Sequence, residues 1–156
     1  MTSSPTILIG VGNRDRGDDA VGPVVCDLVD ERSPGAIPTL VFESSVIDLA
    51  HHWQNDDRVV VVDAGRPGGH PGRVAELDGL AGGLDVPGSV STHSVDVCAA
   101  IELARVLDRL PASLTLIAIE GLSFDLRAPL SDTVRRSAEE VAEQLNRLVA
   151  SASGHG

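Results

Sequence analysis

Three separated positions of this sequence carry residue types that bind metal ions. Asp18 and Asp19 are adjacent and follow an apolar run, Asp63 ends a run of four valines, and His93 stands in the motif Ser91-Thr92-His93-Ser94. Carboxylate oxygens and an imidazole nitrogen suit a divalent first-row metal. Asp19, Asp63 and His93 therefore form a candidate metal-binding trio.

The acidic pair lies in a glycine-rich segment, Gly10 to Gly22, between an expected strand and an expected helix. Glycines allow the tight turn where a strand meets a helix. A nucleotide-binding loop presents the helix N-terminus to a phosphate, which two carboxylates would repel. The segment also lacks the lysine of a P-loop. Its charge favours a metal ion or a cationic group, and a nucleotide-binding protein is the weaker alternative, supported by Gly10-Val11-Gly12 alone.

Each candidate residue also has a purely structural interpretation. Asp18 could cap the helix that follows, and we favour this for Asp18, whereas Asp19 is then left for function because one acid suffices for the cap. Asp63 could be a turn residue. His93 could be a loop histidine, although the neighbouring serines and threonine can cap the next helix without it.

Composition and charge exclude several classes of function. The chain has 156 residues, 42% of them hydrophobic, and a formal net charge of −11. This charge disfavours nucleic acid and anionic membranes as partners. No signal peptide or transmembrane run is recognisable, so we expect a cytoplasmic protein. Arg14 and Arg16, beside the acidic pair, could bind a substrate carboxylate or simply balance charge.

Apolar patterns predict strands that alternate with helices along the chain. The expected strands cover 6–11, 39–43, 58–63, 73–77 and 113–119, and the expected helices cover 19–31, 46–53, 95–110 and a final helix that Ser131 can cap. This alternation predicts a three-layer α/β/α sandwich with a mostly parallel, twisted sheet of about five strands. We expect 73–77 to be a short antiparallel edge strand, 1–150 to form a single domain, and 151–156 to be a disordered tail.

Ligands of open α/β sheets bind beyond the carboxyl ends of the strands. Asp19, Asp63 and His93 each follow a strand, end a strand or precede a helix in this pattern. They are therefore expected to lie close together at one edge of the sheet.

The ordered motifs of the chain resemble those of the hydrogenase maturation proteases. They are Gly10-x-Gly12-Asn13, Gly17-Asp18-Asp19-x-x-Gly22-Pro23, Val-Val-Asp63-Ala64 and Ser91-Thr92-His93. The resemblance spans nearly the whole chain. It implies a twisted sheet flanked by helices, and an endopeptidase that removes the C-terminal extension of a [NiFe]-hydrogenase large-subunit precursor after nickel insertion. It further implies that the family's metal-binding trio falls on Asp19, Asp63 and His93.

The resemblance also sets the expected cofactor and partner. Nickel would be carried by the precursor, and the isolated protein, expected to be a monomer, would hold no tightly bound metal, because three ligands with open positions bind weakly. The expected partner is the large-subunit precursor. Asp18 is a candidate to orient a ligand or to act as a base.

Two segments depart from the family's pattern. Glu43-Ser44-Ser45 replaces a Gly-Thr or Gly-Gly-Ser type of turn that lines the cleft in relatives, and Glu120-Gly121-Leu122 replaces a Gln-Pro-like segment. The altered Ser44-Ser45 turn motivates an alternative function, a non-cleaving metal-dependent chaperone or sensor that binds the hydrogenase precursor. Glu120 adds an acid near the expected site, with a role that the sequence leaves open.

Overall fold

The computed structural model describes residues 6–43, 46–81 and 92–153 of the chain. Its elements follow one another in the order β1 (Thr6–Val11), η1 (Gly17–Ala20), α1 (Val21–Arg32), β2 (Thr39–Phe42), η2 (Leu49–His52), β3 (Arg58–Gly65), β4 (Val74–Asp78), α2 (Thr92–Val106), β5 (Ser113–Glu120) and α3 (Asp132–Ser153). Here η denotes a short 3₁₀ helix. No helix in the described part of the chain is long and apolar enough to cross a membrane.

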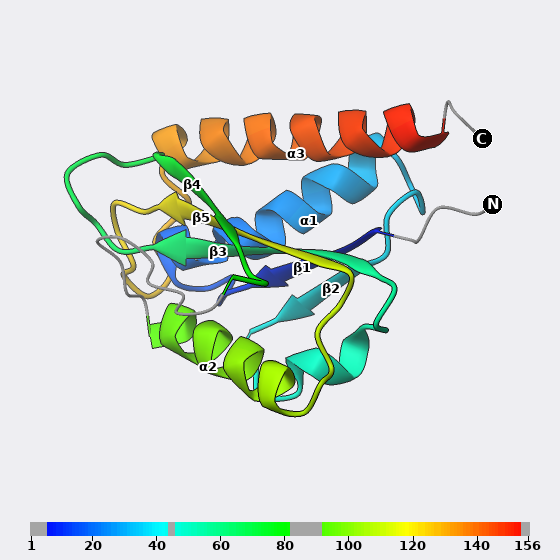
Figure 1. The fold of residues 1–156 in the computed structure, drawn as a ribbon. Helices are drawn as coiled ribbons and strands as arrows, with labels where there is room; N and C mark the ends of the chain where they lie inside the picture. Colours follow the sequence, from blue (N-terminus) through cyan, green and yellow to red (C-terminus); the bar gives the residue numbers. More distant parts are fainter. Residues whose placement is uncertain (1–5, 44–45, 82–91, 154–156) are drawn as a thin grey trace.

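The strands form one five-stranded sheet in the order β2-β1-β3-β5-β4. The first three pairings are parallel, and β4 lies antiparallel to β5 at the edge. Helices α1 and α3 cover one face of the sheet, and α2 with η2 covers the other (Figure 1). The predicted three-layer sandwich, with a mostly parallel sheet and an antiparallel edge strand, is confirmed.

Two apolar cores fill the spaces between these layers. Strand β3 contributes to both, because Val59 and Val61 face the α2 side while Val62 faces α1 and α3. All three side chains are buried. A strand covered on both faces has no polar face, which explains its continuous β-branched run.

The glycines of the first motif allow the backbones of β1, α1 and β3 to approach closely. A Cβ atom added at Gly10 would lie 2.6 Å from the carbonyl oxygen of Gly22, and one added at Gly22 would lie 2.5 Å from that of Val62. At Gly12, where φ is +145°, a Cβ would lie 1.9 Å from the carbonyl oxygen of Asp19. These glycines therefore serve the packing of α1 and η1 on the sheet.

Element boundaries differ from the predicted ones at several ends. The expected helix from Asp19 begins instead with the 3₁₀ turn η1 and becomes α-helical at Val21. The expected helix over 46–53 is reduced to η2. Helix α3 continues to Ser153, so residues 151–153 of the expected tail are helical, and 154–156 lie outside the described residues. Helix ends fray and carry weak sequence signals, which accounts for differences of this size.

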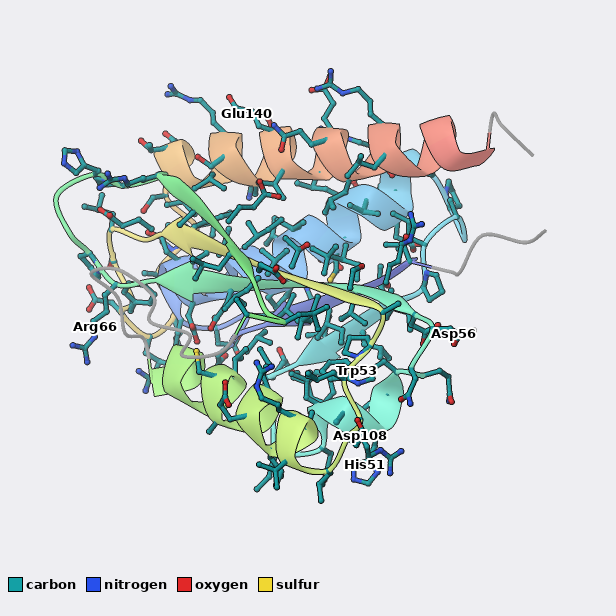
Figure 2. All side chains as sticks on the ribbon, viewed as in Figure 1. His51, Trp53, Asp56, Arg66, Asp108 and Glu140 are labelled. Atoms are coloured by element: carbon teal, nitrogen blue, oxygen red, sulfur yellow. The ribbon has the colours of Figure 1, made fainter. Side chains whose placement is uncertain are left out.

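Residues labelled in Figure 2 locate the two ends of the sheet. Figure 2 shows Arg66 at the end where β3 and β5 finish, and Asp56 at the opposite end. Trp53 lies towards that opposite end, is only 3% exposed, and donates its ring N–H to the carbonyl oxygen of Arg109 at 2.7 Å. The single tryptophan thus reports on the core beneath α2 and η2.

Candidate active site

Asp19 is held in the 3₁₀ turn that follows β1. Its side chain is 4% exposed, and its Oδ2 atom accepts a hydrogen bond from the backbone N–H of Asn13 at 2.9 Å. Asn13 also shapes the turn, because its side-chain oxygen accepts from the N–H of Asp15 at 2.8 Å. A backbone N–H of this turn therefore fixes the direction of the Asp19 carboxylate.

Asp63 lies near the carboxyl end of β3, opposite Ala118 of β5. It is 1% exposed, and its Oδ1 atom accepts from the N–H of Ala64 at 2.8 Å. The 3₁₀ turn that carries Asp19 packs against β3. Two buried carboxylates thus come from contacting elements at the same edge of the sheet.

His93 is the second residue of α2. Figure 1 shows that α2 begins at the edge where β3 and β5 end, the same edge that carries Asp19 and Asp63. The side chain of His93 lies outside the described residues, so the assembly of the trio stays a prediction. The side chains that are described contain no group of three or more that could hold a metal ion.

Asp18 is fully buried and joins two loops. Its Oδ2 atom accepts from the N–H of Leu122 at 2.7 Å, the N–H of Ser123 at 3.1 Å and the hydroxyl of Ser131 at 2.8 Å. Its Oδ1 atom accepts from the N–H of Ser131 at 2.7 Å. The interpretation of Asp18 as a cap of the following helix is wrong, because all four donors belong to the segment between β5 and α3.

Backbone hydrogen bonds extend this connection between the two loops. The N–H of Asp18 donates to the carbonyl oxygen of Ser123 at 2.8 Å, and the N–H of Arg127 donates to that of Asp15 at 2.6 Å. A Cβ added at Gly121 would lie 2.9 Å from the Cβ of Asp18. The turn that carries Asp19 is therefore held by a loop more than a hundred residues away in the chain.

Glu120, whose role the sequence left open, anchors the loop between β3 and β4. Its Oε2 atom accepts from the N–H of Gly68 at 3.0 Å and from the N–H of His70 at 2.6 Å. A loop rich in proline and glycine has few internal hydrogen bonds and needs such an anchor. The proline and glycine content of this loop is visible in the sequence and indicates that an anchor is needed. The sequence does not reveal which residue provides the anchor.

The two arginines beside the acidic pair differ in their surroundings. Arg14 forms a two-pronged ion pair with Asp27, at 2.6 and 3.1 Å, which raises the pKa of Arg14. Arg16 is exposed. Charge balance is therefore the appropriate interpretation for Arg14. Ser44 and Ser45, the altered turn, lie outside the described residues.

A comparison with protein families identifies the class of this protein. A model described as hydrogenase maturation protease matches residues 44–148, well over half of the chain. The chain belongs to the hydrogenase maturation protease family, as its motifs predicted. Family membership makes it a processing endopeptidase, a hydrolase that acts on peptide bonds. A search of curated proteins found no match.

Solved structures of this family share the fold. The chain is similar to the [NiFe] hydrogenase maturation protease HycI from Thermococcus kodakarensis KOD1, with 26% identity, a TM-score of 0.70, and coverage of 94% of this chain and 93% of that chain. HybD from Thermococcus kodakarensis is 22% identical, with a TM-score of 0.75 and coverage of 93% and 99%. The hydrogenase maturating endopeptidase HybD from E. coli is 19% identical, with a TM-score of 0.73 and coverage of 95% and 93%.

Proposed function

We propose that this protein removes the C-terminal extension of a [NiFe]-hydrogenase large-subunit precursor after nickel insertion. In this proposal Asp19, Asp63 and His93 recognise the nickel that the precursor carries. The observation that supports it most is the pair of buried carboxylates on contacting elements at one edge of the sheet. His93 enters the proposal through its motif and through the position of α2.

The donor set fits such an ion. Carboxylate oxygens and an imidazole nitrogen are ligands that divalent first-row metals accept. Because Asp19 and Asp63 are 4% and 1% exposed, water screens them little and a cation would be attracted strongly. Nickel held by these residues would supply a Lewis acid that can polarise a carbonyl or lower the pKa of a bound water.

The protein residues around the pair have orienting roles. We assign Asp18 to orientation and not to proton transfer, because its carboxylate already accepts four hydrogen bonds. These bonds hold the 3₁₀ turn in place, and with it Asp19. The N–H groups of Asn13 and Ala64 fix the directions of the Asp19 and Asp63 carboxylates.

Nickel would arrive with the substrate under this proposal, and the isolated protein would hold no tightly bound metal. A precursor without nickel offers the carboxylates nothing to bind, so it is released uncut. Elemental analysis of the purified protein after dialysis tests this point. Stoichiometric metal that survives a chelator would contradict it.

Cleavage is tested with a large-subunit precursor purified with and without nickel. Intact mass spectrometry should show the loaded precursor shortened at its C-terminus and the unloaded precursor unchanged. The variant Asp63→Asn keeps the shape of the side chain but loses its charge, and we expect at least about a hundredfold slower cleavage. Asp56→Asn, at the opposite end of the molecule (Figure 2), is the matched control and should cleave normally.

Two results would contradict the proposal. One is an unchanged mass of the loaded precursor, and the other is equal cleavage of loaded and unloaded precursor. A stable complex with the precursor that shows no cleavage over hours would instead favour the chaperone or sensor alternative.

A further inference from the structure

The loop between β3 and β4 has an unusual charge for this protein. It runs from Arg66 to Arg73 and contains two arginines, one histidine and no acidic residue, in a chain whose net charge is −11. We call it the cationic loop. It begins three residues after Asp63, at the edge of the sheet that carries the two buried carboxylates (Figure 2).

The cationic loop is anchored at its middle and at its C-terminal end. Glu120 accepts the N–H groups of Gly68 and His70 through its side chain. The backbone of Glu120 accepts from the N–H of Gly72 at 2.7 Å and donates to the carbonyl oxygen of Arg73 at 2.9 Å. One residue, at the end of β5, therefore anchors both the middle and the C-terminal end of the loop.

The composition of the cationic loop restricts it further. Pro67 and Pro71 limit the unfolded conformations of the segment. Gly72, at a φ of +88°, packs so closely on α3 that a Cβ there would lie 2.8 Å from Cγ2 of Thr133. A surface loop held in this way loses little conformational freedom when it binds a partner.

The arginines of this loop make no side-chain contact that would explain their charge. Arg66 and Arg73 are exposed, and neither forms an ion pair or a side-chain hydrogen bond with any residue in the described ranges. Arg14, by contrast, is neutralised by Asp27. Binding residues are often found on loops that a rigid scaffold positions, so the exposed arginines of this anchored loop are candidates for recognition.

The sheet topology sets the spacing of the two arginines. Arg66 follows β3 and Arg73 precedes β4, and β5 lies between these strands. Their backbones are therefore separated by about 10 Å, two strand spacings. An extended peptide advances about 3.3 Å per residue and its alternate side chains share a face, so acidic side chains two or four residues apart, about 7 to 13 Å, bracket this separation.

We propose that the cationic loop binds acidic side chains in the C-terminal extension of the precursor and thereby places this segment beside Asp63. Arginine binds carboxylates through paired N–H groups, which gives the contact direction as well as attraction. The inference rests on the proposed function, and it adds the recognition surface and the chemistry of the segment recognised.

The test compares two double variants that remove the same charge. Arg66→Gln with Arg73→Gln should raise KM for the nickel-loaded precursor about tenfold and leave kcat unchanged, because docking is lost while the chemistry remains. Arg58→Gln with Arg109→Gln removes two exposed arginines at the Trp53 end of the molecule and should leave KM unchanged. Replacing the acidic residues of the extension by their amides should raise KM for the wild type but not for the loop variant.

Binding is measured separately from cleavage, so that the two proposals can fail independently. Fluorescence anisotropy with a labelled peptide of the extension should show weaker binding to the Arg66 and Arg73 variant than to the wild type. The Arg58 and Arg109 variant should bind the peptide like the wild type. An uncut loaded precursor would contradict the proposed function while this binding result still decides the inference. The inference is overturned if the loop variant binds the peptide and cleaves the precursor like the wild type, or if the control variant loses as much binding as the loop variant. It is also overturned if the extension has no acidic residue, or if binding depends only on the terminal carboxylate of the extension.

Discussion

Replacing Asp18 with asparagine removes a charge and converts one hydrogen-bond acceptor into a donor where two loops meet. In its best orientation the asparagine oxygen takes the place of Oδ2 and keeps the three donors there, from Leu122, Ser123 and Ser131. The new amide group then faces the N–H of Ser131, which loses its acceptor. The turn that carries Asp19 is left with a weaker connection to the loop before α3.

The expected loss of stability follows from these four contacts. A hydrogen bond to a charged group contributes about 1.5–3 kcal/mol and one between neutral groups about 1 kcal/mol, so three weakened bonds and one unsatisfied N–H cost several kcal/mol, partly offset by no longer burying a charge. We expect the free energy of unfolding to fall by about 3 kcal/mol. That is a large share of the 5–15 kcal/mol that is typical of such domains.

Urea unfolding followed by Trp53 fluorescence measures this change away from the site, since Trp53 lies towards the other end of the molecule (Figure 2). Asp15→Asn is the matched control, because Asp15 is exposed just before this turn and its carboxylate forms no hydrogen bond or ion pair with any described residue. The free energy of unfolding of this variant should change by less than about 0.5 kcal/mol. If Asp18→Asn is as stable as the wild type, Asp18 does not join the loops as described, and a loss of cleavage in that variant would point to a chemical role.

Three further predictions concern single residues elsewhere in the molecule. Burial raises the pKa of the Cys26 thiol from 9.0 to about 12. Above pH 9 the unfolded chain therefore loses a proton that the folded chain keeps, and the free energy of unfolding should fall by up to about 1.4 kcal/mol per pH unit. The chain has no tyrosine or lysine to obscure this slope, and Cys26→Ala should reduce it in urea titrations from pH 8 to 11; an unchanged slope would mean that Cys26 is not its source. His93→Ala should abolish processing and change the melting temperature by less than about 2 °C, whereas a large drop would mark His93 as structural. Gly22→Ala, which places a Cβ 2.5 Å from a backbone oxygen of β3, should cost at least about 2 kcal/mol in thermal unfolding; Gly65→Ala, whose Cβ would have only ordinary contacts, is the control, and equal losses would refute the packing argument.

The fold was predictable because its signals are local. The β-branched run of β3 and the alternation of strands with helices are visible in short windows of sequence, and they led to the correct layers and the correct edge strand. The shared edge of Asp19 and Asp63 followed from the rule that parallel strands end together. The grouping of His93 with them stays a prediction.

The roles of Asp18 and Glu120 were not predictable, because their partners are distant in the chain. The donors to Asp18 lie 104 to 113 residues away, and those to Glu120 lie 50 and 52 residues away. Local reasoning therefore assigned Asp18 to a helix cap and left Glu120 without a role. Buried or anchoring polar side chains follow tertiary contacts, which sequence spacing does not encode.

The strand order has a consequence for how the protein forms. The first 65 residues contain β1, β2 and β3, which can pair with one another, whereas β4 pairs with β5 and must wait until β5 has been made. Glu120 closes β5, and the donors to Asp18 come after it. On the ribosome, a chain that already contains both Asp19 and Asp63 still lacks the anchors of the cationic loop and of the acidic turn. We therefore expect nascent and truncated chains that end before Ser131 to be inactive, so that proteolytic competence arises only after this part of the chain has been made.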